Sequence, residues 1–194
     1  MDDAMTMTLP SYPRVIEMIK GQIYKMARPA ISHVRASRSI FRILDNHFQG
    51  KKCEFFPEPQ VQLGDDEVAP DACVVCDPSK VTKTKIVGAP DLVIEILSPS
   101  TRRKDMEAKH PLYEEHGVKE YWMIEPVSGD VTIYSLLENG KYNNPPRTYP
   151  LLSEEDKTNM ARDGLHYLII EEFTSPLFPE LTIKLSELFE YLEQ

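Results

Sequence analysis

The hydrophobic pattern is clearest between residues 88 and 113, where a short apolar run precedes a helical pattern. Residues 91–97 read Asp-Leu-Val-Ile-Glu-Ile-Leu, and this β-branched run predicts a buried strand. Side chains alternate along a strand, so Asp91 and Glu95 are expected to share one face with apolar neighbours. Carboxylates on such a face are costly unless they pair, take up protons or hold a cation.

A helix is expected to follow this strand. In it Asp105, Lys109 and Tyr113 are spaced i, i+4, i+8 and therefore lie on one face. From that face Lys109 can reach back toward the strand that carries Glu95. Pro111 interrupts the helical pattern, because proline has no backbone N–H to donate. The helix therefore either bends just past Lys109 or begins late enough for Pro111 to lie in its first turn.

Elsewhere the pattern contains more strands than helices. Strand-like runs cover residues 15–19, 22–26, 53–63, 69–77, 119–125, 130–137 and 167–173. A helix is expected from Ser32 to Phe48, with an inward stripe of Val34, Ser37, Phe41, Leu44 and Phe48, and a short one over 185–193. We expect residues 1–13 to be a flexible start and 142–164 an irregular insertion. The pattern predicts a single α/β or α+β domain over 1–194, built around one central sheet.

Composition limits the cellular compartment and the roles of the cysteines that we expect for this domain. The chain of 194 residues is 41% hydrophobic, without an apolar run that could cross a bilayer and without a signal-peptide pattern, so we expect a cytoplasmic protein. Three cysteines are too few, and odd in number, for a disulfide framework. Cys73 and Cys76 form a CxxC inside a strand-like run, where they point to opposite faces, so small core residues are favoured over a zinc site.

The net charge of −9 argues against a protein that coats DNA electrostatically, since such proteins are usually basic. It argues less against a nuclease, whose acidic centre is neutralised by cations. Any contact with nucleic acid must then use local basic clusters. Arg102, Arg103 and Lys104 form one beside the central strand, and this run is either solvated surface or a set of phosphate contacts.

Several segments together resemble the Uma-two family of restriction-endonuclease-like proteins, within the PD-(D/E)XK nuclease superfamily. They are MIKGQIYKMARPAISH, APDACVVCD, PDLVIEILSPSTRRKDMEAKHPLY, GVKEYWMIEP and FTSPLFPELTIKLSELF. Their order and spacing cover most of the chain. The resemblance implies a restriction-endonuclease-like fold, in which helices flank a mixed central sheet and the site lies at strand ends.

The resemblance also implies site residues. Asp71 matches the aspartate of the Pro-Asp strand, and Glu95 matches the acidic residue of the (D/E)xK strand, so both are expected to bind metal. The lysine two places further on is absent, because Leu97 stands there, and Lys109 from the next helix is the candidate replacement. The alternatives without a catalytic role are that Asp71 is only a turn residue and that Lys109 forms a structural salt bridge.

Further residues are expected to support this centre. Asp91 is a candidate ligand or orienting group, and Glu17 and His33 fall where the resemblance places polar residues near the site. The implied chemistry is Mg²⁺- or Mn²⁺-dependent hydrolysis of phosphodiester bonds in nucleic acid, most simply DNA, by a protein that can act as a homodimer. The alternative is a catalytically inactive scaffold of the same fold that binds nucleic acid or a protein partner.

Overall fold

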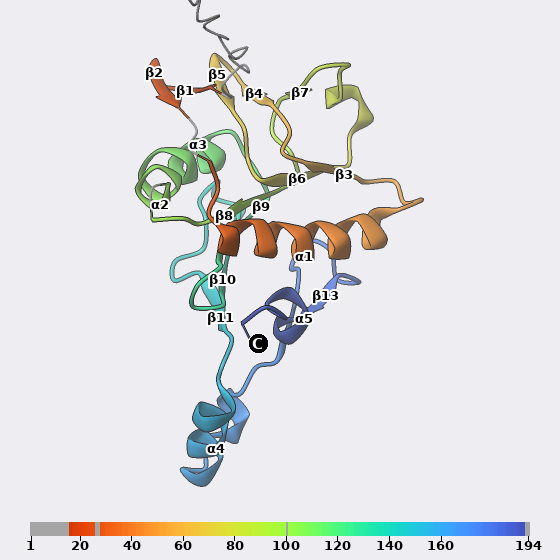
Figure 1. The fold of residues 1–194 in the computed structure, drawn as a ribbon. Helices are drawn as coiled ribbons and strands as arrows, with labels where there is room; N and C mark the ends of the chain where they lie inside the picture. The colour runs from red at the N-terminus through yellow and green to blue at the C-terminus, as the bar shows by residue number, and fades with distance from the viewer. Residues whose placement is uncertain (1–15, 26–27, 100, 193–194) are drawn as a thin grey trace, which may run out of the picture.

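The computed structural model describes residues 16–25, 28–99 and 101–192. Its strands are β1 Ile16–Ile19, β2 Gln22–Lys25, β3 Glu54–Pro57, β4 Val61–Leu63, β5 Asp66–Val68, β6 Ala72–Val75, β7 Ile86–Val87, β8 Leu92–Ile96, β9 Glu120–Glu125, β10 Asp130–Ser135, β11 Arg147–Pro150, β12 Glu172–Thr174 and β13 Thr182–Lys184. Its helices are α1 Ile31–Phe48, α2 Arg102–Lys104, the π-helical turn η2 Asp105–Lys109, α3 His110–Glu115, α4 Glu154–Arg162 and α5 Leu185–Leu188, and short 3₁₀ turns cover Pro78–Lys80 and His166–Leu168 (Figure 1).

A six-stranded mixed sheet forms the centre of the molecule, with the strand order β11-β10-β9-β8-β6-β3. Strands β8 and β9 are parallel, and the remaining neighbours are antiparallel. The site helix, which we define as α2, η2 and α3 together, connects the two parallel strands. The expected α+β fold with a mixed sheet and flanking helices is therefore confirmed.

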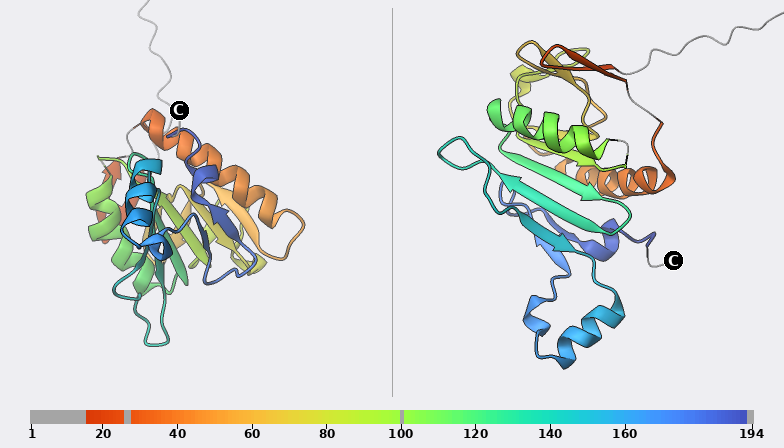
Figure 2. Two further views of the ribbon diagram at one scale, coloured as in Figure 1. Left: turned by 90° about the horizontal axis from the view of Figure 1, so that it is seen from below. Right: turned by 90° about the vertical axis from the view of Figure 1, so that its left-hand side faces the viewer.

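The alternation of β8 divides the interior into two hydrophobic cores. Leu92, Ile94 and Ile96 pack on the side of α1 and α5. Val93 and Leu97 pack on the other side, with Leu112 and Tyr113 of the site helix. Figures 1 and 2 show α1 and the site helix on different sides of the sheet. The predicted two-faced character of residues 91–97 is confirmed.

A second, five-stranded sheet with the order β2-β1-β5-β4-β7 packs on the same hydrophobic core as the site helix. The expected hairpin at its edge is present, because β1 and β2 pair across Lys20 and Gly21. Along β1 exposed and buried side chains alternate, so Glu17 and Ile19 point inward and Met18 points outward. This alternation carries the carboxylate of Glu17 into the interior.

Helix α1 begins at Ile31, after Ala30 and not after a Ser32 cap, and the expected inward stripe is partly wrong. Leu44 and Phe48 are buried as expected, but Val34 is 47% exposed. The buried face instead begins with small residues at positions 36 and 39, followed by Ile40. Small side chains allow close packing on a sheet, and a stripe chosen by hydrophobicity overlooks them.

The segment expected to be an irregular insertion, residues 142–164, contains regular structure. Strand β11 extends the central sheet beside β10, and α4 projects away from the body of the protein (Figure 1). Tyr142 is buried in the core on the side of the site helix. The strand expected over 167–173 is only a 3₁₀ turn and the beginning of β12. The flexible start expected for residues 1–13 lies outside the described residues.

The expectation for Cys73 as a small core residue agrees with its burial, but the expectation for Cys76 is wrong, because Cys53 and Cys76 form a disulfide. Cys53 lies directly before β3 and Cys76 directly after β6, and these antiparallel strands bring the two ends together. Cys73 is a free, buried thiol whose pKa is raised by burial. Within the described ranges, no helix has the length and apolar character needed to cross a membrane.

Candidate active site

A cavity of about 90 Å³ opens at the end of β8 from which the chain enters the site helix. We call it the site cavity. Most of its chemically active groups come from segments that are far apart in the sequence. Its lining comprises Arg28, Pro29, His33, Glu58, Asp71, Glu95, Ile96, Ser98, Thr101, Lys104, Asp105 and Lys109. The cavity therefore brings together all three predicted catalytic residues.

Glu95 extends from β8 into this cavity and is only 3% exposed. Its Oε1 accepts hydrogen bonds from Lys109 Nζ at 2.8 Å and from the Tyr113 hydroxyl at 2.7 Å. Burial raises the pKa of Glu95 to about 8, although the charge of Lys109 opposes this rise. The charge of Lys109 thus supports an ionised carboxylate at a position where burial favours the protonated form.

Asp71 lies just ahead of β6 and is fixed from two sides. Its Oδ2 accepts a hydrogen bond from the backbone N–H of Ile96 at 2.6 Å, which holds it beside the strand that carries Glu95. Its Oδ1 lies 3.1 Å from Nε2 of His33 on α1. Burial alone would lower the pKa of His33, but the hydrogen bond and charge of Asp71 outweigh it and raise that pKa.

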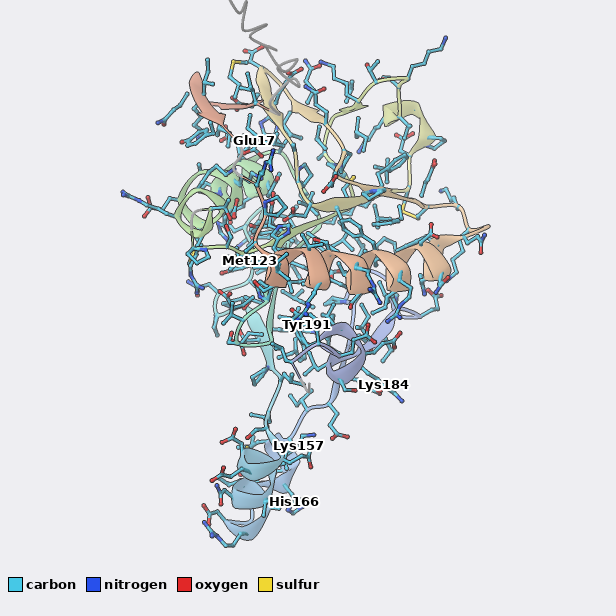
Figure 3. All side chains as sticks on the ribbon, viewed as in Figure 1. Glu17, Met123, Lys157, His166, Lys184 and Tyr191 are labelled. Carbon is cyan, nitrogen blue, oxygen red and sulfur yellow. A yellow bond between two sulfur atoms is a disulfide. The ribbon has the colours of Figure 1, made fainter. Side chains whose placement is uncertain are left out.

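Glu17 closes the cluster from the second sheet and is fully buried. Its Oε1 lies 2.6 Å from Lys109 Nζ and accepts a hydrogen bond from the Ala69 backbone at 3.1 Å. Its Oε2 pairs with Lys104. Burial opposes ionisation of Glu17, but the two lysines outweigh it and lower its pKa. Figure 3 shows the labelled Glu17 where the β1–β2 hairpin meets the site helix.

Lys109 is the cation at the centre of this cluster and is 1% exposed. Besides Glu17 and Glu95 it faces Asp105, whose Oδ1 is 3.7 Å from Nζ. Desolvation would lower the pKa of Lys109, but the surrounding carboxylates raise it, so the ammonium keeps its proton. The predicted reach of Lys109 back to the Glu95 strand is present in the structure.

Pro111 lies in the first turn of α3, as the second of the two expected arrangements has it, although helical residues also precede α3. The helix runs from residue 102 to 115, and the π-helical turn η2 lies immediately before the segment that contains Pro111. A π turn widens the helix and often marks a functional site. Across this turn Asp105 and Lys109 both remain on the buried face.

Asp105 is the site residue that sequence reasoning did not assign. It is 2% exposed, it lines the site cavity, and burial raises its pKa. Its Oδ1 is buried without a hydrogen-bond partner in the described part of the chain. The i, i+4 spacing with Lys109 was the signal that places it on this face.

Asp91 lies at the opposite end of β8 from the site cavity. Its Oδ2 accepts a hydrogen bond from the Cys76 backbone at 2.7 Å, and its Oδ1 pairs with Lys119 at 2.7 Å. Asp91 therefore shares the strand face of Glu95 without joining its site. These contacts tie together the ends of β6, β8 and β9.

The basic run at the start of the site helix divides in the structure. Arg102 pairs with Glu125, and Arg103 pairs with Glu107 at 2.8 Å on an exposed surface. Only Lys104 of the three lines the site cavity. Lys104 is thus the residue of this run best placed to meet a group that enters the cavity.

The chemistry of the site suits a hard divalent cation. The buried Glu17 pairs with both lysines of the cavity, and the lining combines the acids Glu58, Asp71, Glu95 and Asp105 with the basic side chains Arg28, His33, Lys104 and Lys109. Oxygen donors of this kind are the ligands that Mg²⁺ prefers, and Mg²⁺ keeps several of its waters. Among the described residues no three or more His, Cys, Asp or Glu side chains are grouped for joint metal binding. Asp71 and Glu95 fit a cation held by two carboxylates and water.

Comparison with known proteins adds an independent observation. Residues 7–165 match the sequence profile of the Uma2 family, which is described as "Putative restriction endonuclease". A protein of Synechocystis sp., described only as uncharacterised, is 29% identical over 130 residues, which cover 65% of this chain and 68% of that protein.

A solved structure has a similar fold. It is a crystal structure of a protein from Anabaena variabilis, described as a "putative nuclease belonging to DUF820". The TM-score is 0.66 at 21% sequence identity, and the match covers 95% of this chain and 94% of the other. At this identity the likeness concerns the fold.

Proposed function

The chain belongs to the Uma2 family, and from that premise and the chemistry of the site cavity we propose that it is a Mg²⁺-dependent endonuclease acting on DNA. The observation that carries the proposal is the convergence of Asp71, Glu95 and Lys109 on one cavity. These three residues come from separate segments, and each is held by several contacts. A strand end, a second strand and a helix thus supply two acids and one cation, as phosphodiester hydrolysis requires.

Asp71 and Glu95 are the residues that would hold Mg²⁺, or Mn²⁺ in its place. When bound, the cation would supply Lewis-acid polarisation of a phosphate oxygen and a more acidic water. The backbone N–H of Ile96 and the ring of His33 orient the carboxylate of Asp71. Tyr113 orients the carboxylate of Glu95 by donating a hydrogen bond from its hydroxyl group.

Lys109 acts in this scheme as a fixed positive charge. Its pKa is raised by the carboxylates around it, so it is a poor general base and a stable cation. Its role is to stabilise negative charge that develops on the phosphate oxygens or on the attacking water. The lysine missing at position 97 is thereby supplied from the site helix.

The basic run at residues 102–104 supplies cationic groups that would contact the phosphates of the substrate. Lys104 lines the site cavity, and its side chain is 11% exposed, so it can meet the scissile phosphate. Arg102 and Arg103 lie outside the cavity, where each can exchange its present carboxylate partner for a flanking phosphate. With a net charge of −9, contacts of this local kind must provide the electrostatic attraction to DNA.

Nicking of supercoiled plasmid with Mg²⁺ or Mn²⁺ tests this proposal. Glu95→Gln, Asp71→Asn and Lys109→Met should each reduce the nicking rate about 100-fold or more, the scale of a lost charge-stabilising group. Asp91→Asn is the matched control, because Asp91 is a buried carboxylate on the same strand face but outside the cavity. Its nicking rate should stay within about threefold of wild type, so that only cavity residues carry the effect.

Equal nicking by Glu95→Gln and wild type would refute the proposed centre. Absence of metal-dependent nicking in wild type, across DNA and RNA substrates, would favour the second candidate, an inactive scaffold of this fold. One observation favours that candidate: the ammonium of Lys109 already pairs with the carboxylate of Glu95, at 2.8 Å.

A further inference from the structure

One carboxylate oxygen in the site cavity has no hydrogen-bond partner. Asp105 Oδ1 is buried, and within the described residues nothing donates to it. The side chain belongs to a residue that is 2% exposed and lines the cavity. A buried carboxylate oxygen without a donor is costly, because it gives up hydration and gains nothing in exchange. A ligand entering the cavity would remove this cost.

Pairing with Lys109 does not account for Asp105. Lys109 Nζ lies 2.6 Å from Glu17 and 2.8 Å from Glu95, but 3.7 Å from Asp105 Oδ1. An ammonium group has three protons, and its two short contacts satisfy the carboxylates of the other residues. At 3.7 Å Asp105 feels the charge of Lys109 without a hydrogen bond.

The charged partners of the buried carboxylates also single out Asp105. Glu17 is compensated by both lysines, since its two oxygens contact Lys109 and Lys104 separately. Asp71 has His33, and Glu95 shares Lys109 with Glu17. Asp105 is therefore the buried carboxylate of this cluster without a short contact to a cationic group, since Lys109 Nζ lies 3.7 Å from its Oδ1.

We propose that Asp105 is a supporting carboxylate of the metal centre, which accepts a hydrogen bond from a water of the divalent cation held by Asp71 and Glu95. This inference rests on the proposed function, because it adds a residue to that site. Contact through water fits the structure, because Mg²⁺ keeps several waters in protein sites and no three acidic or His side chains among the described residues are grouped to bind one cation directly. The site helix then supplies both an acid and, four residues later, the cationic Lys109.

The π turn gives this assignment a structural basis. Asp105 is the first residue of η2 and Lys109 the last, and both are buried. The turn therefore presents exactly one acid and one lysine to the cavity, while Glu107 between them is exposed and pairs with Arg103. Thr101 donates a hydrogen bond to the side chain of Asp105, but Oδ1 has no donor among the described residues.

Calorimetric titration of the full chain with Mn²⁺ tests the inference. Asp105→Asn keeps the shape of the side chain and removes its charge, so Mn²⁺ affinity should fall about tenfold or more. Asp91→Asn, a buried carboxylate outside the cavity, should bind like wild type, and Glu95→Gln should lose binding. Wild-type affinity in Asp105→Asn, with binding lost in Glu95→Gln, would overturn this inference and leave the proposed function standing.

Absence of Mn²⁺ binding in wild type would refute the proposed function and this inference together. Asp105→Glu provides a second measurement, which does not depend on how Asp105→Asn folds. It keeps the negative charge of the side chain, so its Mn²⁺ affinity should exceed that of Asp105→Asn. An affinity no higher than that of Asp105→Asn would overturn the assignment.

Discussion

Lys109 keeps a positive charge in a place that water barely reaches. The cost of removing an ammonium group from water is several kcal/mol, and close carboxylates must offset it. Glu17 and Glu95 do so at 2.6 and 2.8 Å, from two different sheets. The charge of Lys109 is therefore part of what holds the two sheets to the site helix, as well as part of the proposed chemistry.

Replacement of Lys109 by methionine should lower the free energy of unfolding by about 3–5 kcal/mol at neutral pH, because it strands buried carboxylates. Urea unfolding measures this change. Lys20→Met is the control, since its pair with Glu115 is exposed, and it should cost at most about 1 kcal/mol. Adding Glu95→Gln to Lys109→Met should recover part of the loss. If Lys109→Met were as stable as wild type, the cluster would not have the energetic role inferred here.

His110 gives the protein a dependence on pH. It packs against Tyr134 and Tyr142, with ring centroids 4.5 and 5.2 Å apart, and burial lowers its pKa from the usual 6.5. The unfolded chain therefore binds more protons than the native protein just below pH 6.5, and stability falls as the pH falls through that window.

His110→Phe should keep the ring packing and remove this proton uptake. Between about pH 5 and 6.5 the unfolding free energy of wild type should then rise more steeply with pH than that of the variant. Urea midpoints measured across that range provide the comparison. Parallel profiles for the two proteins would show that His110 does not contribute.

At the scale of elements, the features that depend on local periodicity could be predicted from the sequence. The two faces of β8 follow from its period of two, and the reach of Lys109 follows from helical spacing. The position of Asp91 away from the site could not be predicted in the same way. A shared face says nothing about which end of a strand meets the cavity, and that depends on the partners of β8.

Other features were hidden because they depend on tertiary pairing. The disulfide needs Cys53 and Cys76 at adjacent ends of β3 and β6, and their pairing is not visible in a single sequence. The polar segment around β11 looks irregular alone, and it becomes a strand because β10 offers an open edge. The π turn before Pro111 was not predicted either, since a proline in a helical pattern is compatible with several local geometries.

The π turn should be essential for aligning Asp105 with Lys109. Deletion of Glu107 is expected to convert η2 to α-helix, so that Asp105 and Lys109 become i, i+3 and their directions about the helix axis differ by about 60°. Mn²⁺ affinity should fall more than tenfold, with the helical circular dichroism signal largely retained. Glu107→Ala keeps the chain length and should bind Mn²⁺ like wild type. Full Mn²⁺ affinity in the deletion variant would show that the turn is dispensable.

At the scale of the whole molecule, the covalent link and the site cavity lie at opposite ends of β6. Asp71 precedes this strand and Cys76 follows it, so five residues, or roughly 16 Å of extended chain, separate them. The backbone N–H of Cys76 contacts Asp91, at the end of β8 that lies away from the cavity. Stability and metal binding should therefore respond separately to loss of the disulfide.

Because the bridge spans 23 residues, its removal should lower the free energy of unfolding by about 3 kcal/mol. The variant that combines Cys53→Ser with Cys76→Ser should show this loss in urea unfolding, while its Mn²⁺ affinity stays within about twofold of wild type. Dithiothreitol should destabilise wild type to the same extent and leave the double variant unchanged. A parallel loss of Mn²⁺ affinity would mean that the far end of β6 is coupled to the cavity, contrary to the separation seen in the structure.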